Sequence, residues 1–230
     1  MILCGKTIPT RANAKYDPED LHRCHFHNGH MGRCQEYPYL DHLAEVAPKV
    51  KNKVIRDATK TTGAAWKSDD AGPNRISRWV MMLSDAELFD LGIDMSKLKP
   101  GVIAKLREKA ASYDDCMASA KYLTYLVYGM VNAPEPDKYT REYIEEIFGP
   151  IMKGSTSCLI CKSPLDFEEF SEARRGRAEI ETAHAQPRLH TPGNIGFAHR
   201  DCNIAQGDKT LPDFYEWIAG ILERRRQENC

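Results

Sequence analysis

Two short motifs in the last third of the sequence share one spacing that is typical of metal ligands. Cys158 and Cys161 are separated by two residues, and so are His199 and Cys202. Two thiolates at this spacing form a knuckle that holds one side of a tetrahedral zinc ion, and a second half-site completes the coordination. The alternative, two unrelated pairs of thiols and side chains, would need two matched half-sites to arise by chance. The sequence therefore predicts a structural Cys3His zinc site that stabilises the fold around it.

The residues between and after these half-sites predict a small β–β–α unit. Residues 178–182 are typical of a strand, and a turn signal with proline and glycine follows at residues 192–194. A second short strand is expected through residues 196–197, and a helix is expected to open at residues 202–203. The first half-site would then anchor the start of this unit, and the second would anchor the start of its helix.

At these positions the chain resembles the HNH, or ββα-metal, nuclease family, in the branch that carries a pair of zinc knuckles. The resemblance covers about residues 155–210. In that family a histidine ends the first strand, an asparagine lies in the connecting loop, and a histidine or asparagine begins the helix after the last zinc cysteine. His184, Asn194 and Asn203 match these three positions. The combination of this triplet with four zinc ligands is specific, whereas a scattered His-Asn-His triplet would be weak.

The resemblance implies a role for each of the three matching residues. His184 would be the general base, since a histidine that titrates near neutral pH can take a proton from water. Asn203 would give an oxygen ligand to a catalytic Mg²⁺ or Mn²⁺ ion. Asn194 would hold the loop so that His184 points correctly. Outside this pattern, His184 would be interpreted as an ordinary surface histidine of a strand.

One position departs from the family pattern. The residue before the general base is usually a metal-binding aspartate or histidine, but here it is Ala183, whose methyl group binds no metal. Three explanations are open. Another acid, Glu181 or Asp208, substitutes for it, and Glu181 shares the strand face of Ala183. Alternatively, the alanine is an inactivating substitution, in which case an aspartate at 183 would restore metal binding, or the unit binds DNA without cutting it.

A second cluster of cysteines and histidines lies near the N-terminus. Cys4, Cys24 and Cys34, with either His27 or His30, would make a second zinc site. The spacing is irregular, so a loop without metal is the alternative. No apolar run is long enough for a signal peptide or a membrane span, which favours metal-binding thiols in a reducing cytoplasm over disulfides.

The rest of the chain predicts helices. A short helix is expected over residues 84–92, a buried helical face over residues 113–130, and another helix over residues 139–148. A last helix after Thr210 carries an apolar face that should pack on the nuclease unit. The expected fold class is α+β: a mostly helical N-terminal and middle region, residues 1–150, followed by a zinc-stabilised ββα-metal domain, residues 151–230.

The segment 49–79 is expected to contact DNA, because it holds eight basic residues against three acidic ones, with tryptophans and threonines interleaved. A solvated basic face is the alternative, and the net charge of −1 for the whole chain favours neither. The residues chosen as candidate DNA contacts are Lys51, Lys53, Arg56, Lys60, Lys67, Arg75 and Arg78.

Taken as a whole, the sequence predicts a metal-dependent endonuclease acting on double-stranded DNA. The long region before the nuclease unit favours sequence-selective recognition, as in HNH-type restriction enzymes, and a palindromic target would match a two-fold homodimer. Nicking, homing and phage-packaging nucleases stay open as alternatives. Ala183 also keeps open a zinc-stabilised DNA-binding module without catalysis.

Overall fold

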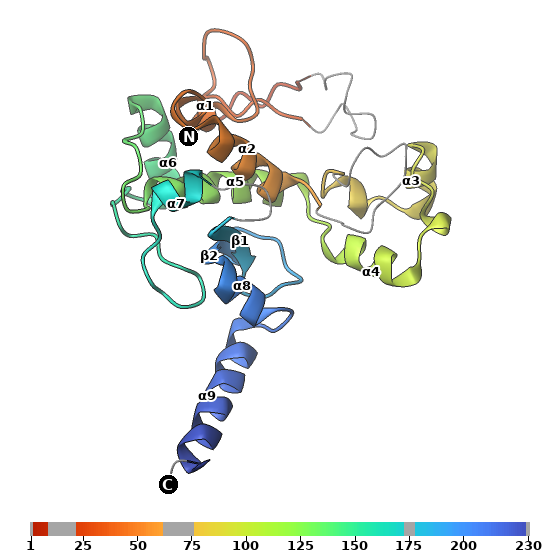
Figure 1. Ribbon diagram of the computed structural model, residues 1–230. Helices are drawn as coiled ribbons and strands as arrows, with labels where there is room; N and C mark the ends of the chain where they lie inside the picture. Colours follow the sequence, from red (N-terminus) through yellow and green to blue (C-terminus); the bar gives the residue numbers. More distant parts are fainter. Residues whose placement is uncertain (1, 9–21, 62–75, 173–177, 229–230) are drawn as a thin grey trace.

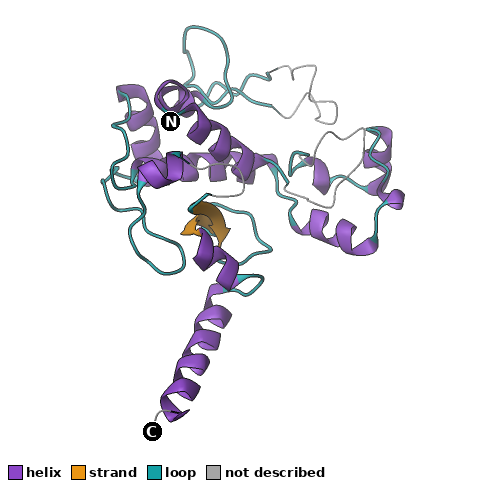
Figure 2. Ribbon diagram, viewed as in Figure 1, coloured by secondary structure: helices purple, strands orange, loops and turns teal. Residues whose placement is uncertain are grey.

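The fold is known from a computed structural model that describes residues 2–8, 22–61, 76–172 and 178–228 (Figure 1). Helices dominate the described part, and its only sheet has two strands, so the expected mixed class is confirmed (Figure 2). The elements are α1 (Asp41–Val46), α2 (Pro48–Thr59), α3 (Asp85–Asp90), α4 (Pro100–Glu108), α5 (Tyr113–Tyr128), α6 (Lys138–Phe148), α7 (Phe167–Ser171), β1 (Ile180–His184), β2 (Ile195–His199), α8 (Arg200–Gln206) and α9 (Leu211–Glu228), with 3-10 turns at Pro38–Leu40, Val80–Met82 and Met95–Lys97.

Helix α5 is the centre of the molecule, and it presents the buried face that the sequence predicts. Cys116, Ala120, Leu123 and Val127 are all fully buried, and they recur at the three- and four-residue steps of one helix face. Ser112 caps the helix by accepting a hydrogen bond from the backbone N–H of Asp115. Helix α5 packs against α2, α6 and β2, so it joins the helical region to the sheet.

One large core extends across the expected domain boundary at residue 150. It combines Val54 and Leu123 from the helical region with Leu165, Phe170 and Phe197 from the C-terminal region. A smaller cluster, from Ile76 to Met117, gathers around α3 and α4. The division into residues 1–150 and 151–230 stays a prediction, but the two parts share a single main core.

The short helix α3 forms where the sequence predicts it. Ser84 and Glu87 make a capping box, in which each side chain hydrogen-bonds to the backbone N–H of the other residue. Gly92 ends the segment with a φ of +83°, a conformation that favours glycine.

The C-terminal strands form an antiparallel pair in which Ala183 lies opposite Gly196 and His184 lies opposite Ile195. Strand β1 begins two residues later than residues 178–182 predict, so His184 belongs to the strand and closes it. Helix α8 follows β2 directly and packs against both strands. The expected β–β–α order is therefore present.

Helix α9 extends away from the rest of the molecule (Figure 1). Its first turn is anchored by Leu211 and Phe214, which are buried, but Trp217 and Leu222 are 46% and 54% exposed. The expectation that its whole apolar face packs on the nuclease unit is correct only for the beginning of the helix. No helix in the described residues is long and apolar enough to span a membrane.

Candidate active site and metal clusters

The four C-terminal zinc candidates come together in the structure. The Sγ atoms of Cys158, Cys161 and Cys202 and a ring nitrogen of His199 all lie within 4.8 Å of one another. Nδ1 of His199 is 3.4 Å from Sγ of Cys161. Ligand atoms around a tetrahedral zinc are separated by roughly 3.5–3.8 Å, given bond lengths near 2.0–2.3 Å. The chemistry and spacing of this cluster therefore fit zinc.

The thiols of this cluster differ in their tendency to ionise. Burial raises the pKa of Cys161, but hydrogen bonds from Ser163, Cys158 and His199 outweigh burial and lower this pKa to about 6. Burial and the hydrogen bond with Cys161 raise the pKa of Cys202 to about 12. Each thiolate raises the pKa of its neighbours through electrostatic repulsion, and a divalent cation bound between them would offset this repulsion.

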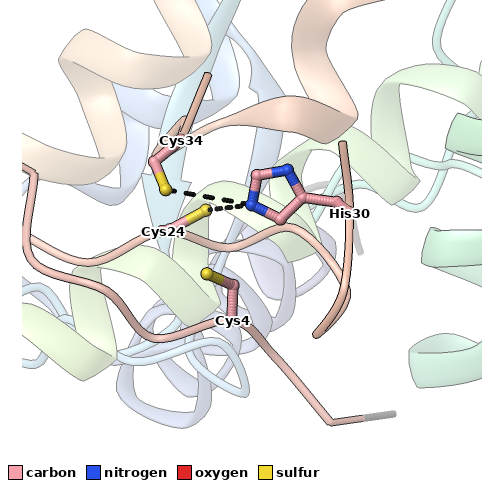
Figure 3. Close-up of side chains that lie close together, drawn as sticks. All are labelled: Cys4, Cys24, His30 and Cys34. Carbon is pink, nitrogen blue, oxygen red and sulfur yellow. Dashed lines mark hydrogen bonds between the residues drawn. The ribbon is translucent and has the colours of Figure 1, made fainter. Parts of the chain in front are cut away.

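The N-terminal cluster has the same composition and similar geometry. Cys4, Cys24, His30 and Cys34 place their ligand atoms within 4.8 Å of one another. Nε2 of His30 is 3.4 Å from Sγ of Cys24 and 3.8 Å from Sγ of Cys34, and the three thiols lie on the side of the ring that carries this nitrogen (Figure 3). Of the two histidines that the sequence left open, the structure brings His30 into the cluster. His27 instead packs edge-on against the ring of Tyr143.

His184 lies at the end of β1, where both its backbone and its side chain have partners. The side-chain amide of Gln206, from α8, donates a hydrogen bond of 2.9 Å to the carbonyl oxygen of His184. Nε2 of His184 lies 3.0 Å from Nδ1 of His190, and Nε2 of His190 lies 2.7 Å from the carbonyl oxygen of Ala58. Sequence reasoning missed both His190 and Gln206.

The surroundings of His184 keep its ring neutral. Burial, followed by the positive charges of Arg78 and Lys109, lowers the pKa of His184 to about 4. At neutral pH the ring therefore has an unprotonated nitrogen that can accept a proton. This is the protonation state that a general base needs.

Asn194 makes several hydrogen bonds within the loop between β1 and β2. It is 7% exposed. Its Oδ1 accepts a hydrogen bond of 2.8 Å from the backbone N–H of Gln186, and its Nδ2 donates to the carbonyl oxygens of Gln186 and Leu189. These bonds clamp the loop between β1 and β2, which also carries His190.

Asn203 on α8 lies beside Glu181 on β1. Nδ2 of Asn203 donates a hydrogen bond of 3.2 Å to Oε2 of Glu181, whose other oxygen is 3.4 Å from Arg200. Because Glu181 accepts from the amide nitrogen, Oδ1 of Asn203 points away from this carboxylate. An amide oxygen held in this way suits a hard divalent cation.

Ala183 faces the interior. It is 1% exposed and belongs to the main core. Its methyl group therefore packs against apolar neighbours, which is a reason for alanine at this position that the sequence did not reveal.

We expect Ala183→Asp to destabilise the protein by about 2–4 kcal/mol, because it buries a carboxylate among apolar groups. Thermal and urea unfolding measure the effect, and Ala219→Asp on an exposed part of α9 is the matched control. A variant that melts like the parent chain and cleaves DNA faster would show that the aspartate reaches a metal instead.

A cavity of about 240 Å³ lies beside these groups. His184, His190 and Asn203 line it together with Arg78 and Lys109, while its Arg188 and Glu108 are 3.8 Å apart and offset each other's charge. Arg78 is 5% exposed, and within the described residues no hydrogen-bond partner meets its Nε. The cavity thus combines a neutral histidine, an asparagine and positively charged side chains.

The basic stretch that was expected to contact DNA has many partners inside the protein. Nζ of Lys53 donates to the carbonyl oxygen of Ile180 in β1. Nζ of Lys60 donates to Oγ of Ser77, and Nη1 of Arg78 donates to the carbonyl oxygen of Lys109. Arg56 pairs with Asp57 at 2.6 Å, Lys51 is partly exposed, and Lys67 and Arg75 lie outside the described residues.

Two comparisons with known proteins found matches. A family model described as DraIII matches residues 36–202. A solved structure described as the crystal structure of a type II restriction endonuclease is 42% identical, with a TM-score of 0.85, and the match covers 99% of this chain and 100% of that one. No curated protein matches the chain. The family match includes His184 and the C-terminal Cys/His cluster. It begins after Cys34, so it does not include the N-terminal Cys/His cluster.

Proposed function

This chain belongs to the DraIII family, and we propose that it is an HNH-type restriction endonuclease that hydrolyses phosphodiester bonds in double-stranded DNA. The single observation that carries this proposal is the cavity lined by a neutral histidine, His184, together with Asn203 and the basic side chains of Arg78 and Lys109. Hydrolysis of a phosphodiester needs a base for water and a positive environment for the phosphate. The solved relative, described as a type II restriction endonuclease, supports the same reaction.

Four residues that line the cavity, and Asn194 in the neighbouring loop, have defined parts in the proposed reaction. His184 would accept the proton of the attacking water, and Asn203, oriented by Glu181, would hold a Mg²⁺ or Mn²⁺ ion through its amide oxygen. Such a cation supplies Lewis-acid stabilisation of the phosphate and of the leaving oxygen. Arg78 and Lys109 add positive charge at the wall of the cavity, where a phosphate would lie. Asn194 keeps the loop of the site in place.

The two Cys/His clusters hold structural zinc in this proposal. Zinc held by Cys158, Cys161, His199 and Cys202 would connect the knuckle to the beginning of α8, the helix that carries Asn203. Zinc held by Cys4, Cys24, His30 and Cys34 would connect the first residues of the chain to the segment around His30. Both donor sets are complete, so neither offers an open coordination position for catalysis.

DNA contacts outside the cavity are proposed for Lys51 and for Arg56, whose side chain is about one-third exposed. Lys67 and Arg75 stay in the proposed set from their sequence alone. Lys53 and Lys60 contribute to the electrostatic field rather than to direct contacts, because their ammonium groups are bonded within the protein. A homodimer on a palindromic site and a cytoplasmic location complete the proposal.

Incubation of plasmid DNA with the zinc-loaded chain tests this function. We expect Mg²⁺ or Mn²⁺ to produce discrete linear fragments, and sequencing of the fragment ends to reveal one recurring site. Omission of the divalent cation, with zinc retained, is the control. A second candidate, a DNA-binding module without catalysis, is favoured by Ala183, and binding to DNA without cleavage under any cation would support it.

A further inference from the structure

A chain of two hydrogen bonds links the side chain of His184 to the backbone of α2. It runs from Nε2 of His184 to Nδ1 of His190 over 3.0 Å, and from Nε2 of His190 to the carbonyl oxygen of Ala58 over 2.7 Å. His190 is 4% exposed, so its ring nitrogens find their partners within the protein. Ala58 lies on a helix outside the ββα unit, 132 residues away from His190 in the sequence.

The position of each proton in these two hydrogen bonds follows from the carbonyl oxygen of Ala58 at their far end. A carbonyl oxygen only accepts, so Nε2 of His190 carries a hydrogen. Burial and the charge of Arg78 lower the pKa of His190 to about 3, so its ring is neutral and its Nδ1 is an acceptor. Nε2 of His184 must then donate, and Nδ1 of the neutral His184 has no hydrogen.

We propose that His190 is a positioning residue that holds His184 in the tautomer with an unprotonated Nδ1, and that this Nδ1 is the atom that accepts the proton of the attacking water. The inference rests on the proposed nuclease function and adds to it the base atom and the residue that selects this atom. Among the described residues no hydrogen-bond partner meets Nδ1 of His184. His184 also lines the cavity that contains Asn203.

Both histidines are held tightly enough for this arrangement to persist. Asn194 fixes the loop residues Gln186 and Leu189, which lie just before His190. Gln206 holds the carbonyl oxygen of His184. A functional side chain keeps its geometry when its own partners are fixed by buried hydrogen bonds, and this condition is met at both ends of the His184–His190 pair.

Because His190 bonds to Ala58, the orientation of His184 also depends on how α2 packs against β1. Two further contacts connect α2 to β1: Nζ of Lys53 bonds to the carbonyl oxygen of Ile180, and the carboxylate of Asp57 accepts a hydrogen bond of 2.8 Å from Oγ1 of Thr182. The orientation of His184 therefore depends on residues of α2, which lie outside the ββα unit.

Nitrogen NMR of the zinc-loaded full chain without DNA tests the tautomer. The ¹⁵N shifts of a histidine ring distinguish its protonated nitrogen from its unprotonated one, and the spectrum of His184→Gln identifies the signals of His184. We expect Nε2 to carry the proton and Nδ1 to have none. A His184 ring protonated at Nδ1 and not at Nε2 would overturn the proposal.

Kinetics of paired variants test the role of His190. In His190→Asn the amide oxygen replaces Nδ1 as an acceptor, whereas His190→Leu fills a similar volume without any acceptor. We expect the leucine variant to lose about 10–100-fold in kcat with little change in KM, and the asparagine variant to keep most of the activity. His42→Leu is the matched control, because His42 is also partly buried and bonded, to Tyr128, in α1.

Two outcomes of these kinetics are decisive. If both variants at position 190 melt at the same temperature and lose kcat equally, only packing matters there and the proposal is wrong. If the parent chain shows the expected tautomer but never cuts DNA, the proposed nuclease function fails, and with it the role of Nδ1 as a base. The tautomer of His184 would then still stand on the NMR result.

Discussion

Replacing His184 by alanine is expected to lower the rate of DNA cleavage by about two to four orders of magnitude and to leave DNA affinity almost unchanged. The imidazole is the neutral acceptor in the cavity, and its pKa of about 4 keeps it in the basic form at neutral pH. The basic groups Arg78 and Lys109 remain in the variant, so the attraction for phosphate remains as well. Single-turnover cleavage at saturating protein concentration measures the rate, and a titration without divalent cation measures affinity.

The matched control is His42→Ala, which removes a partly buried histidine of α1 and should cleave like the parent chain. His184→Gln offers a second comparison, because it keeps a polar side chain but provides no base. Full activity in either variant of His184 would show that another group takes the proton. The HNH assignment of the base would then be wrong.

Loss of the C-terminal zinc is expected to unfold more than the ββα unit. A structural zinc contributes on the order of 10 kcal/mol to folding, which is comparable to the whole stability of a typical domain. Cys158 and Ile160 of the knuckle are buried in the main core. The backbone N–H of Leu159 donates a hydrogen bond of 2.8 Å to the carbonyl oxygen of Phe197, so the knuckle and β2 are joined directly. Removing the ion should therefore destabilise the shared core as a whole.

Cys202→Ala tests this expectation, with Cys116→Ala as its matched control. Both change a cysteine to alanine, but Cys116 lies on the buried face of α5 and outside both clusters. We expect elemental analysis to find two zinc ions in the parent chain and in Cys116→Ala, and one in Cys202→Ala. Circular dichroism should show a loss of helix in Cys202→Ala alone. The zinc assignment would be refuted if the purified parent chain contained no zinc and added zinc left its melting temperature unchanged.

Local patterns in the sequence predicted those features that depend on few residues. The spacing of Cys158, Cys161, His199 and Cys202 was enough to predict a cluster, because a knuckle and the start of a helix each bring two ligands together. The apolar periodicity of α5 likewise predicted its buried face, because side chains three and four residues apart share one side of a helix.

Features that depend on packing between distant segments could not be predicted in this way. The bond from His190 to Ala58 exists only because α2 lies against the sheet, and no local pattern encodes that contact. The charge run around Lys53 had the composition of a DNA-binding surface, but composition does not reveal which side chains turn toward a neighbouring strand. The apolar face of α9 was equally visible in the sequence, although Trp217 and Leu222 on this helix are exposed.

The core shared across residue 150 has a consequence for protein engineering. Nuclease units that fold by themselves can be fused to foreign targeting domains, but a fusion that begins at residue 151 would strip this unit of α2 and α5. Phe170 and Phe197, now buried in the core that those helices help to build, would face water. The carbonyl oxygen of Ala58 would also be missing from the end of the His184–His190 pair. Transfer of the proposed cleavage activity to a chimeric protein would therefore require the helical scaffold together with the ββα unit.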